Sequence, residues 1–321
     1  LCRFPIYDIG VISSFKDRLV TILVAPLMSC SARLPVYTLV IGTVFLAQKP
    51  VLGVFTLGGL VLMSMYVLSI VTGVTIAALF KSTILRSPRP PLLLELPTYK
   101  LPSPKSLLLN MFDRGRLFVI RAGTVILAAT VILWAVMIIP IHHTDTSSFE
   151  VARAAVTSDA QIDQETRSAK LTKIDGQEKA AKLENSVGGA MGKLIEPAIA
   201  PLGFDWKMGI GIIASFAARE VFVSGLAVVH GVGGADENSA SLRDALKSEI
   251  NPRTGEAAFT PLVGLALMVF FVLACQCMST VAIVRRETMS WKWPVFMVAY
   301  MTVLAWLGAF AVYQGGNLLG F

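Results

Sequence analysis

The hydrophobic positions of this chain fall into long blocks instead of alternating with polar positions. The clearest block is Val51–Phe80, thirty residues without a carboxylate, lysine, arginine or histidine. A helix needs about 20 consecutive apolar residues to cross the hydrocarbon core of a bilayer. Further apolar segments lie at 18–47, 117–141, 208–230, 261–284 and 294–319. The pattern therefore predicts an all-α fold, a polytopic bundle of transmembrane helices.

The composition agrees with a membrane location. Hydrophobic residues make up 55% of the chain and charged residues only 15%, whereas a soluble domain is usually about a quarter charged. The net charge of +7 comes largely from the stretch between Lys81 and Arg121, which holds eight basic and two acidic residues. The positive-inside rule places such a stretch in the cytoplasm. No aromatic residues interleave with a basic stripe, so we expect the lipid bilayer, and no nucleic acid, as a partner.

The polar stretches divide the chain into four parts. Residues 1–80 contain a first interrupted apolar region and the span after it, and residues 81–141 a proline-rich cytoplasmic connection and a third span. The prolines of that connection disfavour a long helix up to about residue 115. Residues 142–202 are predicted to form an extramembrane loop, and residues 203–321 a second interrupted region and the last spans. The loop ends in an expected interfacial helix over 187–199, with one apolar face: Val187, Met191, Leu194, Ile195, Ile199.

Two prolines interrupt the first apolar segment. Pro26 and Pro35 bracket eight residues that include Cys30 and Arg33, and a proline breaks or kinks a helix. An arginine at membrane depth costs several kcal/mol unless it faces protein, water or a partner. Irregular backbone at that depth is tolerated only where it is buried in protein or lines a cavity. This segment is therefore a better candidate for a transport site than for a plain anchor.

The segment 208–230 is apolar but carries Arg219 and Glu220 in its middle. If it simply crossed the membrane, the loop 231–260, with five acidic and three basic residues, would lie inside. The stretch 285–293, with three basic and one acidic residue, would then lie outside. Because the positive-inside rule favours the reverse, we interpret 208–230 as a re-entrant or broken hairpin. Glu220 is then a candidate functional carboxylate, and a structural ion pair with Arg219 is the alternative.

Two short elements share a pattern of sulfur and hydroxyl groups close to arginine. Paired polar breaks in two halves of a transporter point to its substrate site. Thiolate and thioether groups suit Fe(II), Cu(I) or Zn, and a conducting site must release its ion, which favours two or three ligands at a time. Alternatively, the cysteines, Cys275 included, are merely packed hydrophobic residues. The candidate metal ligands, with Glu220, are Met28, Ser29 and Cys30 in the first element and Cys277, Met278 and Ser279 in the second.

Other motifs do not support an enzyme. Residues 188–193 resemble a phosphate-binding loop, but Val187 and Leu194 occupy the positions that require glycine and Ser or Thr. His142 and His143 lack a third metal ligand at helical spacing, so an interfacial role is favoured. No Ser/His/Asp or Cys/His arrangement indicates hydrolysis. The amino terminus has neither an initial Met nor a signal peptide, as expected for a fragment or a trimmed product.

Residues 20–37, from Val20 through Pro26-Leu27-Met28-Ser29-Cys30-Ser31 to Tyr37, resemble the first Gate region of the FeoB family of ferrous iron transporters. The resemblance implies Fe(II) uptake across the bacterial inner membrane, coupled to GTP hydrolysis by an amino-terminal G domain. No Gly-x-x-x-x-Gly-Lys-Ser/Thr occurs here, so this chain is not expected to hydrolyse GTP itself. Four more stretches agree with the family in the right order: 95–102, 195–206, 214–223 and 276–288.

The same resemblance assigns the metal-handling cysteines. By position these are Cys30 and Cys277, and Cys2 fits a third, in a Cys-x-x-Pro element, although residues 6–10 differ from the family's usual sequence. The implied partners are ferrous iron, the missing G domain, a small Feo-type accessory protein and further copies of the chain. Two alternatives stay open: a Gate-type transporter of an organic solute such as a nucleoside, and a non-transporting membrane assembly module.

Overall fold

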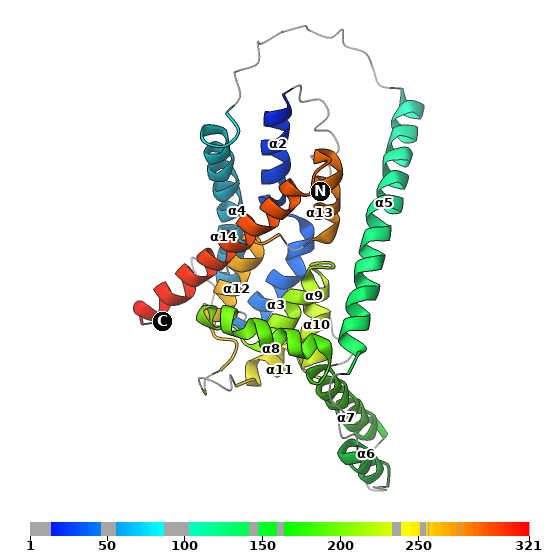
Figure 1. The fold of residues 1–321 in the computed structure, drawn as a ribbon. Helices are drawn as coiled ribbons and strands as arrows, with labels where there is room; N and C mark the ends of the chain where they lie inside the picture. Colours follow the sequence, from blue (N-terminus) through cyan, green and yellow to red (C-terminus); the bar gives the residue numbers. More distant parts are fainter. Residues whose placement is uncertain are drawn as a thin grey trace.

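The structure, a computed structural model, is built from helices (Figure 1). It describes residues 14–45, 56–86, 103–140, 147–158, 164–232, 239–250, 255, 257–275 and 277–320. Across these ranges two isolated β-bridges form, between Pro140 and Ser186 and between Ile250 and Ala257, and no β-strand.

Four stretches are long and apolar enough to cross a membrane: Phe15–Val44, Leu57–Ser82, Pro261–Thr288 and Lys292–Leu318. The first and third are each composed of two helices with an irregular stretch between them. This arrangement confirms the predicted all-α, polytopic class. The elements are α2 (Phe15–Val24), η2 (Ala25–Leu27), η3 (Ser31–Arg33), α3 (Leu34–Val44), α4 (Leu57–Ser82), α5 (Pro104–Ile138), α6 (Ser147–Ser158), α7 (Gln164–Glu184), α8 (Val187–Ile199), η4 (Ala200–Leu202), α9 (Trp206–Ser215), α10 (Val221–Val229), α11 (Ala240–Ser248), α12 (Pro261–Leu273), α13 (Met278–Thr288) and α14 (Lys292–Leu318).

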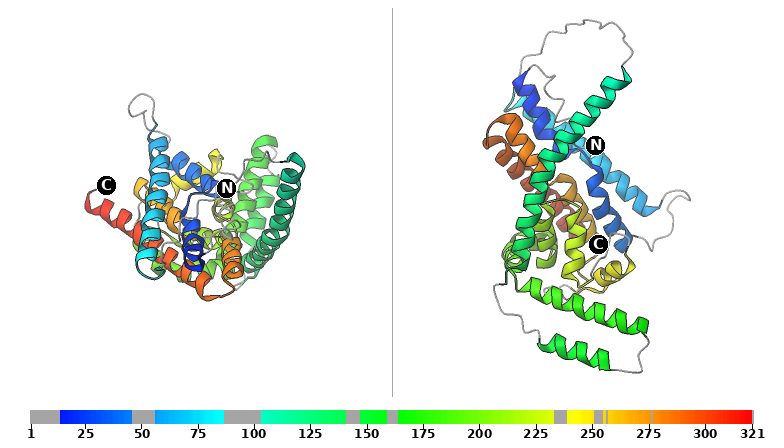
Figure 2. Two further views of the ribbon diagram at one scale, coloured as in Figure 1. Left: turned by 90° about the horizontal axis from the view of Figure 1, so that it is seen from above. Right: turned by 90° about the vertical axis from the view of Figure 1, so that its right-hand side faces the viewer.

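Helix α5 begins earlier than the sequence pattern predicts. We expected an extended connection up to about residue 115, but the helix starts at Pro104. Ser103 caps it by accepting a hydrogen bond from the Ser106 N–H, and a proline in the first turn needs no N–H of its own. Pro104 is the last proline of the connection, so nothing after it opposes a helix. Figures 1 and 2 show α5 at the edge of the bundle, and its apolar part is Gly123–Ile138.

Helix α12 lies at the centre of the bundle. Its residues from Ala266 to Leu273 are all buried, as expected for a helix that is apolar on every side. Gly308 lets α14 pack closely against Leu273 and Val269, and Gly264 does the same for Val40 of α3. By contrast, α4, α5 and α14 expose many large apolar side chains, which is the surface a bilayer would cover.

Helices α6 and α7 form a hairpin that projects from one end of the bundle (Figures 1 and 2). Arg153 of α6 donates to Asp175 at 2.6 Å and to Glu178 at 2.7 Å on α7. Gly176 of α7 lies directly against Gly231, which follows α10 and has a φ of +71°. The hairpin is thus docked on the bundle by a contact that leaves no room for a side chain.

Helix α8, the expected interfacial helix, packs on the bundle through its glycines. Gly192 lies against Ile210 of α9, and Gly188 against Met137 of α5. On the predicted apolar face, Met191 and Leu194 remain exposed while Ile199 is buried. The glycines therefore make close protein contacts, since small residues let two backbones approach closely. The predicted apolar face is only partly exposed, because Ile195 packs against the core and Ile199 is buried.

Helices α9 and α10 fold back on each other as a hairpin. Gly211 of α9 lies against Phe222 of α10. Both outer ends of the hairpin meet one carboxylate, because Lys207 and His230 each contact Glu249. A helix of 10 residues is only about 15 Å long, half of a bilayer core of about 30 Å. The two ends therefore lie together, and residues 216–220 form the tip.

The docking of the α6–α7 hairpin can be tested at Gly176. We expect Gly176→Ala to destabilise the protein by about 1–3 kcal/mol, because a Cβ would overlap the carbonyl oxygen of Gly231. Gly115→Ala is the control, since nothing lies within 4 Å of its added Cβ in α5, and it should stabilise by about 0.5–1 kcal/mol. Unfolding in detergent measures both. Equal stability of the two variants would contradict the docked arrangement.

The base of the α9–α10 hairpin should depend on pH through Glu249. Burial alone would raise the pKa of Glu249, but hydrogen bonds and charges from His230 and Lys207 outweigh it and hold the pKa below its ordinary value of 4.5. A carboxyl group whose pKa is lowered by folding stabilises the fold at pH values above its ordinary pKa. That stability is lost as the pH falls through the lowered pKa. We therefore expect Glu249→Gln to lower the apparent Tm by a few degrees at pH 6.

The difference between wild type and Glu249→Gln should shrink when the same unfolding experiment is run below pH 4. Burial raises the pKa of the neighbouring Asp205, but both proteins retain Asp205, so its titration cancels in the comparison. A Tm difference that does not shrink when the pH falls well below 4 would argue against the charged contact.

Candidate functional site

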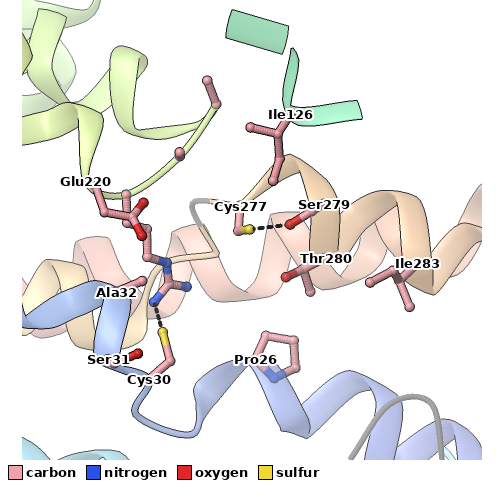
Figure 3. A pocket seen from close by; sticks show the side chains of 13 residues that line it. Pro26, Cys30, Ser31, Ala32, Ile126, Glu220, Cys277, Ser279, Thr280 and Ile283 are labelled. Atoms are coloured by element: carbon pink, nitrogen blue, oxygen red, sulfur yellow. Dashed lines mark hydrogen bonds between the residues drawn. The ribbon is translucent and has the colours of Figure 1, made fainter. Parts of the chain in front are cut away.

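Three interruptions of the helices meet around one cavity. The first is residues 25–33 between α2 and α3, and the second is residues 216–220 at the tip of the α9–α10 hairpin. The third lies between α12 and α13, where Ala274, Cys275 and Cys277 are described. Figure 3 shows side chains of all three directed at a common space of about 420 Å³. Its lining residues are Pro26, Cys30, Ser31, Ala32, Ile126, Ala217, Ala218, Arg219, Glu220, Cys277, Ser279, Thr280 and Ile283.

The main chain of the first interruption is held by side chains. Arg33 is fully buried, and its guanidinium donates to the carbonyl oxygens of Pro26 at 3.0 Å and Leu27 at 3.3 Å. The Ser69 hydroxyl of α4 also donates to Leu27, at 2.7 Å, and the Tyr300 hydroxyl of α14 donates to the Leu23 carbonyl. Buried carbonyls without a partner cost free energy, so these contacts make the break stable.

Arg219 connects the second interruption to the other two. It is 6% exposed, and its Nη1 donates to Cys30 Sγ at 3.7 Å, while its Nη2 donates to the Ala274 carbonyl at 3.3 Å. The main chain adds a further link, because the Met278 N–H donates to the Phe216 carbonyl at 3.1 Å. The tip of the α9–α10 hairpin is therefore bonded to both neighbouring interruptions.

The two cysteines occupy equivalent places in their segments. Cys30 and Cys277 are half-buried, have extended backbones and stand at the N-cap positions of η3 and α13. Cys277 Sγ lies 2.8 Å from the Ser279 hydroxyl. The amino-terminal end of a helix carries a partial positive charge that favours a negative group. Two sulfurs, each at the start of a helical segment, thus line the same cavity (Figure 3).

The structure brings together part of the predicted ligand set. Cys30, Cys277, Ser279 and Glu220 line the cavity. Met28 and Met278 are about half exposed and are not among the lining residues. Met278 is the first residue of α13, directly after Cys277.

The remaining predicted residues lie elsewhere. The Ser29 hydroxyl is buried and has no hydrogen-bond partner in the described part of the chain, and Cys2 lies outside the described residues. In the ranges that the structure describes, no three His, Cys, Asp or Glu side chains form a group that could hold a metal ion. Any ion in this cavity would therefore have at most two such side chains at once, completed by hydroxyl, carbonyl or water oxygens.

Sequence reasoning missed the partner of Arg219. We considered a structural ion pair with Glu220, but Arg219 bonds to Cys30 and Ala274 instead, and Glu220 is exposed to the cavity. These partners are 189 and 55 residues away in sequence, so no local pattern indicates them. Cys275, by contrast, is buried in the hydrophobic core beside Met297 and Met301, as a packed cysteine should be.

Two family models match the chain. The model described as "Ferrous iron transport protein B C terminus" matches residues 62–114, and the model described as "Nucleoside recognition", the Gate domain, matches residues 119–291. No solved structure matches the chain.

Similar proteins are named as FeoB, alone or as part of a fusion protein. The Fe(2+) transporter FeoB of Leptospira biflexa is 40% identical over all 321 residues, which is 42% of its own length. The Fe(2+) transporter FeoB of Staphylococcus aureus strain COL is 33% identical over 99% of the chain and 39% of its own length. A Porphyromonas gingivalis protein, named as a fusion of Fe(2+) transport protein A and FeoB, is 33% identical over 99% of the chain and 37% of its own length.

The interrupted helices, the shared cavity and the Gate match define a polytopic membrane protein of the Gate type. The chain belongs to the FeoB family. It spans about two fifths of the length of the curated relatives it matches.

The role of Arg33 gives a direct test of the site's architecture. We expect Arg33→Met to destabilise the protein by about 3 kcal/mol, because two buried carbonyls lose a charged donor. Arg286→Met, at an exposed position of α13, should change stability by less than about 0.5 kcal/mol. Unfolding of both variants in the same detergent measures the difference. If Arg33→Met were as stable as Arg286→Met, the carbonyl contacts would not be holding the first interruption.

Proposed function

We propose that this chain forms the membrane pathway through which ferrous iron enters the bacterial cell across the inner membrane. The observation that supports this most strongly is that Cys30 and Cys277, from separate helix interruptions, line the same cavity. Sulfur ligands favour Fe(II) over Mg²⁺ or Ca²⁺, which prefer oxygen. The relatives named as Fe(2+) transporters support the same cargo.

Within this proposal, four side chains that line the cavity contact the ion as it passes, and no more than two of Cys30, Cys277 and Glu220 contact it at once. Cys30 and Cys277 supply sulfur, Ser279 a hydroxyl and Glu220 a carboxylate. A transported ion must be bound weakly enough to leave again, so a partial shell completed by water serves better than a closed cage. We assign Met28, Ser29 and Met278 to the path beside the cavity, and Cys2 to a third thiol on the strength of the family resemblance.

The α9–α10 hairpin fits a re-entrant element. Its two ends meet at Glu249 and its tip reaches the cavity. Non-helical backbone at membrane depth is tolerated where it is buried or lines a water-filled cavity. We propose that 208–230 enters and leaves the membrane on one side, with residues 81–121 in the cytoplasm.

The complete transporter would supply energy and partners that this chain does not. We propose that a G domain coupled to it hydrolyses GTP and drives the transport cycle. A small Feo-type accessory protein is a further proposed partner, and the name of the Porphyromonas gingivalis fusion protein supports it. We propose that the transporter assembles from several copies in the bilayer.

An organic solute is the second candidate cargo. The name of the Gate model, "Nucleoside recognition", favours it, and a cavity of about 420 Å³ falls in the size range of small-molecule sites. The two cysteines favour iron, since a nucleoside does not need sulfur ligands. A non-transporting assembly module is the third possibility, and it predicts full tolerance of cysteine replacement.

Radioactive iron uptake by cells that express the complete transporter distinguishes these functions. We expect Cys30→Ser and Cys277→Ser each to lower the uptake rate at least tenfold, because a hydroxyl is a poor substitute for sulfur toward Fe(II). Cys275→Ser is the matched control, because Cys275 is buried outside the cavity lining, and its uptake should stay within about twofold of wild type. Expression is checked for each variant.

Unchanged iron uptake in both cavity variants would exclude the metal pathway. If uptake of a radioactive nucleoside depended on the cavity instead, the organic-solute function would replace it. If every variant took up both solutes as wild type does, the non-transporting assembly module would be the remaining candidate function.

A further inference from the structure

Arg219 is a fixed positive charge in a cavity to which we assign a divalent cation. Its Nη1 donates to Cys30 Sγ at 3.7 Å, so the guanidinium occupies one side of a sulfur that iron would have to approach. Like charges a few ångströms apart repel strongly where water is scarce. A cation bound to Cys30 and a guanidinium bound to Cys30 therefore exclude each other.

Two hydrogen bonds, both to other segments, hold the guanidinium of Arg219. Its bond to the Ala274 carbonyl is 3.3 Å, longer than the usual value of about 2.9 Å. Its Nε is buried and has no hydrogen-bond partner in the described part of the chain. Arg219 stands on a short tip between α9 and α10 rather than inside a helix.

Arg33 serves as an internal contrast. It is also a buried arginine beside the cavity, but its Nη1 and Nη2 donate to carbonyls of its own segment, at Leu27 and Pro26. That pattern fits a structural role. Arg219 instead makes one contact to Cys30, a proposed metal ligand, and one to Ala274 in a different segment. This pattern is expected of a side chain that responds when an ion binds.

We propose that Arg219 is a tethered cation that holds Cys30 while the cavity is empty, is displaced when iron binds, and returns to help release the ion. The inference rests on the proposed iron pathway. In that pathway Arg219 positions Cys30 and does not itself bind the ion. Displacement also breaks the contact to Ala274, so occupation of the cavity loosens the tip of the α9–α10 hairpin from the third interruption. Iron binding and a change in helix packing are thereby coupled through one side chain.

The test is to compare ion binding with ion turnover in Arg219→Gln, using the complete transporter. Co(II) is the binding probe, because its charge-transfer absorption reports coordination by sulfur. We expect Arg219→Gln to bind Co(II) at least tenfold more tightly than wild type, since a competing positive charge is removed. Its maximal rate of iron uptake should fall at least tenfold, because release loses its competitor. Arg219→Lys, which keeps a cation, should stay within about threefold of wild type in both measurements.

A merely structural role predicts the opposite sign for binding. Loss of the contacts to Cys30 and Ala274 would then weaken Co(II) binding and uptake together in Arg219→Gln, and that result would overturn the proposal. Arg286→Gln, at an exposed position of α13, is the control for removing a positive charge and should change neither quantity.

A second measurement on the wild-type protein covers the case in which Arg219→Gln does not fold. Amide hydrogen exchange of residues 216–220 should become at least threefold faster when Co(II) saturates the cavity, because the tip is released. Unchanged or slower exchange would refute displacement.

The failure of this inference can be told apart from failure of the proposed function. If wild type shows the sulfur absorption band with Co(II) but Arg219→Gln does not bind more tightly, only the role of Arg219 is wrong. If wild type shows no such band and Cys30→Ser binds Co(II) as well as wild type does, the iron site itself is wrong.

Discussion

The structure depends on satisfying polar main-chain groups where helices stop inside an apolar bundle. Each interruption leaves carbonyl or N–H groups without helical partners, and without water they must be bonded by the protein. Two buried arginines do much of this: Arg33 bonds the carbonyls of Pro26 and Leu27, and Arg219 bonds that of Ala274. Arginine suits this role because its planar group offers several donors and keeps its charge.

The same interruptions create the chemistry of the cavity. A helix that starts in the middle of the bundle presents its amino-terminal end there, and Cys30 and Cys277 occupy those ends. The hairpin α9–α10 supplies the charged tip, Arg219 and Glu220, from a third direction. Sulfur, carboxylate and guanidinium groups are therefore gathered around one cavity without a closed metal cage. The proposed ion pathway, which must also release its ion, would require such an open arrangement.

Much of the fold follows from hydrophobic pattern, and its departures have local causes. Apolar blocks indicated the four candidate spans, because bilayer thickness fixes the helix length, whereas the block at 117–141 gave only the shorter apolar helix Gly123–Ile138. We predicted the start of α5 too late because we expected every proline of the connection to disfavour a helix. Pro104 instead occupies the first turn of α5, where a proline fits well. The inward face of α8 was not evident either, since its contacts use Gly188 and Gly192, which hydrophobic periodicity does not count.

The sequence by itself determined the membrane class, the interrupted segments and the sulfur-bearing residues, because apolar run length, proline and residue type are local properties. Only the tertiary structure decided which of those residues meet. It placed Cys30, Cys277, Ser279 and Glu220 around one cavity, left Met28 and Met278 outside its lining, and bonded Arg219 to Cys30. These contacts join segments up to 189 residues apart, and they depend on how helices pack and on which way each side chain points at a break, which spacing along the chain does not specify.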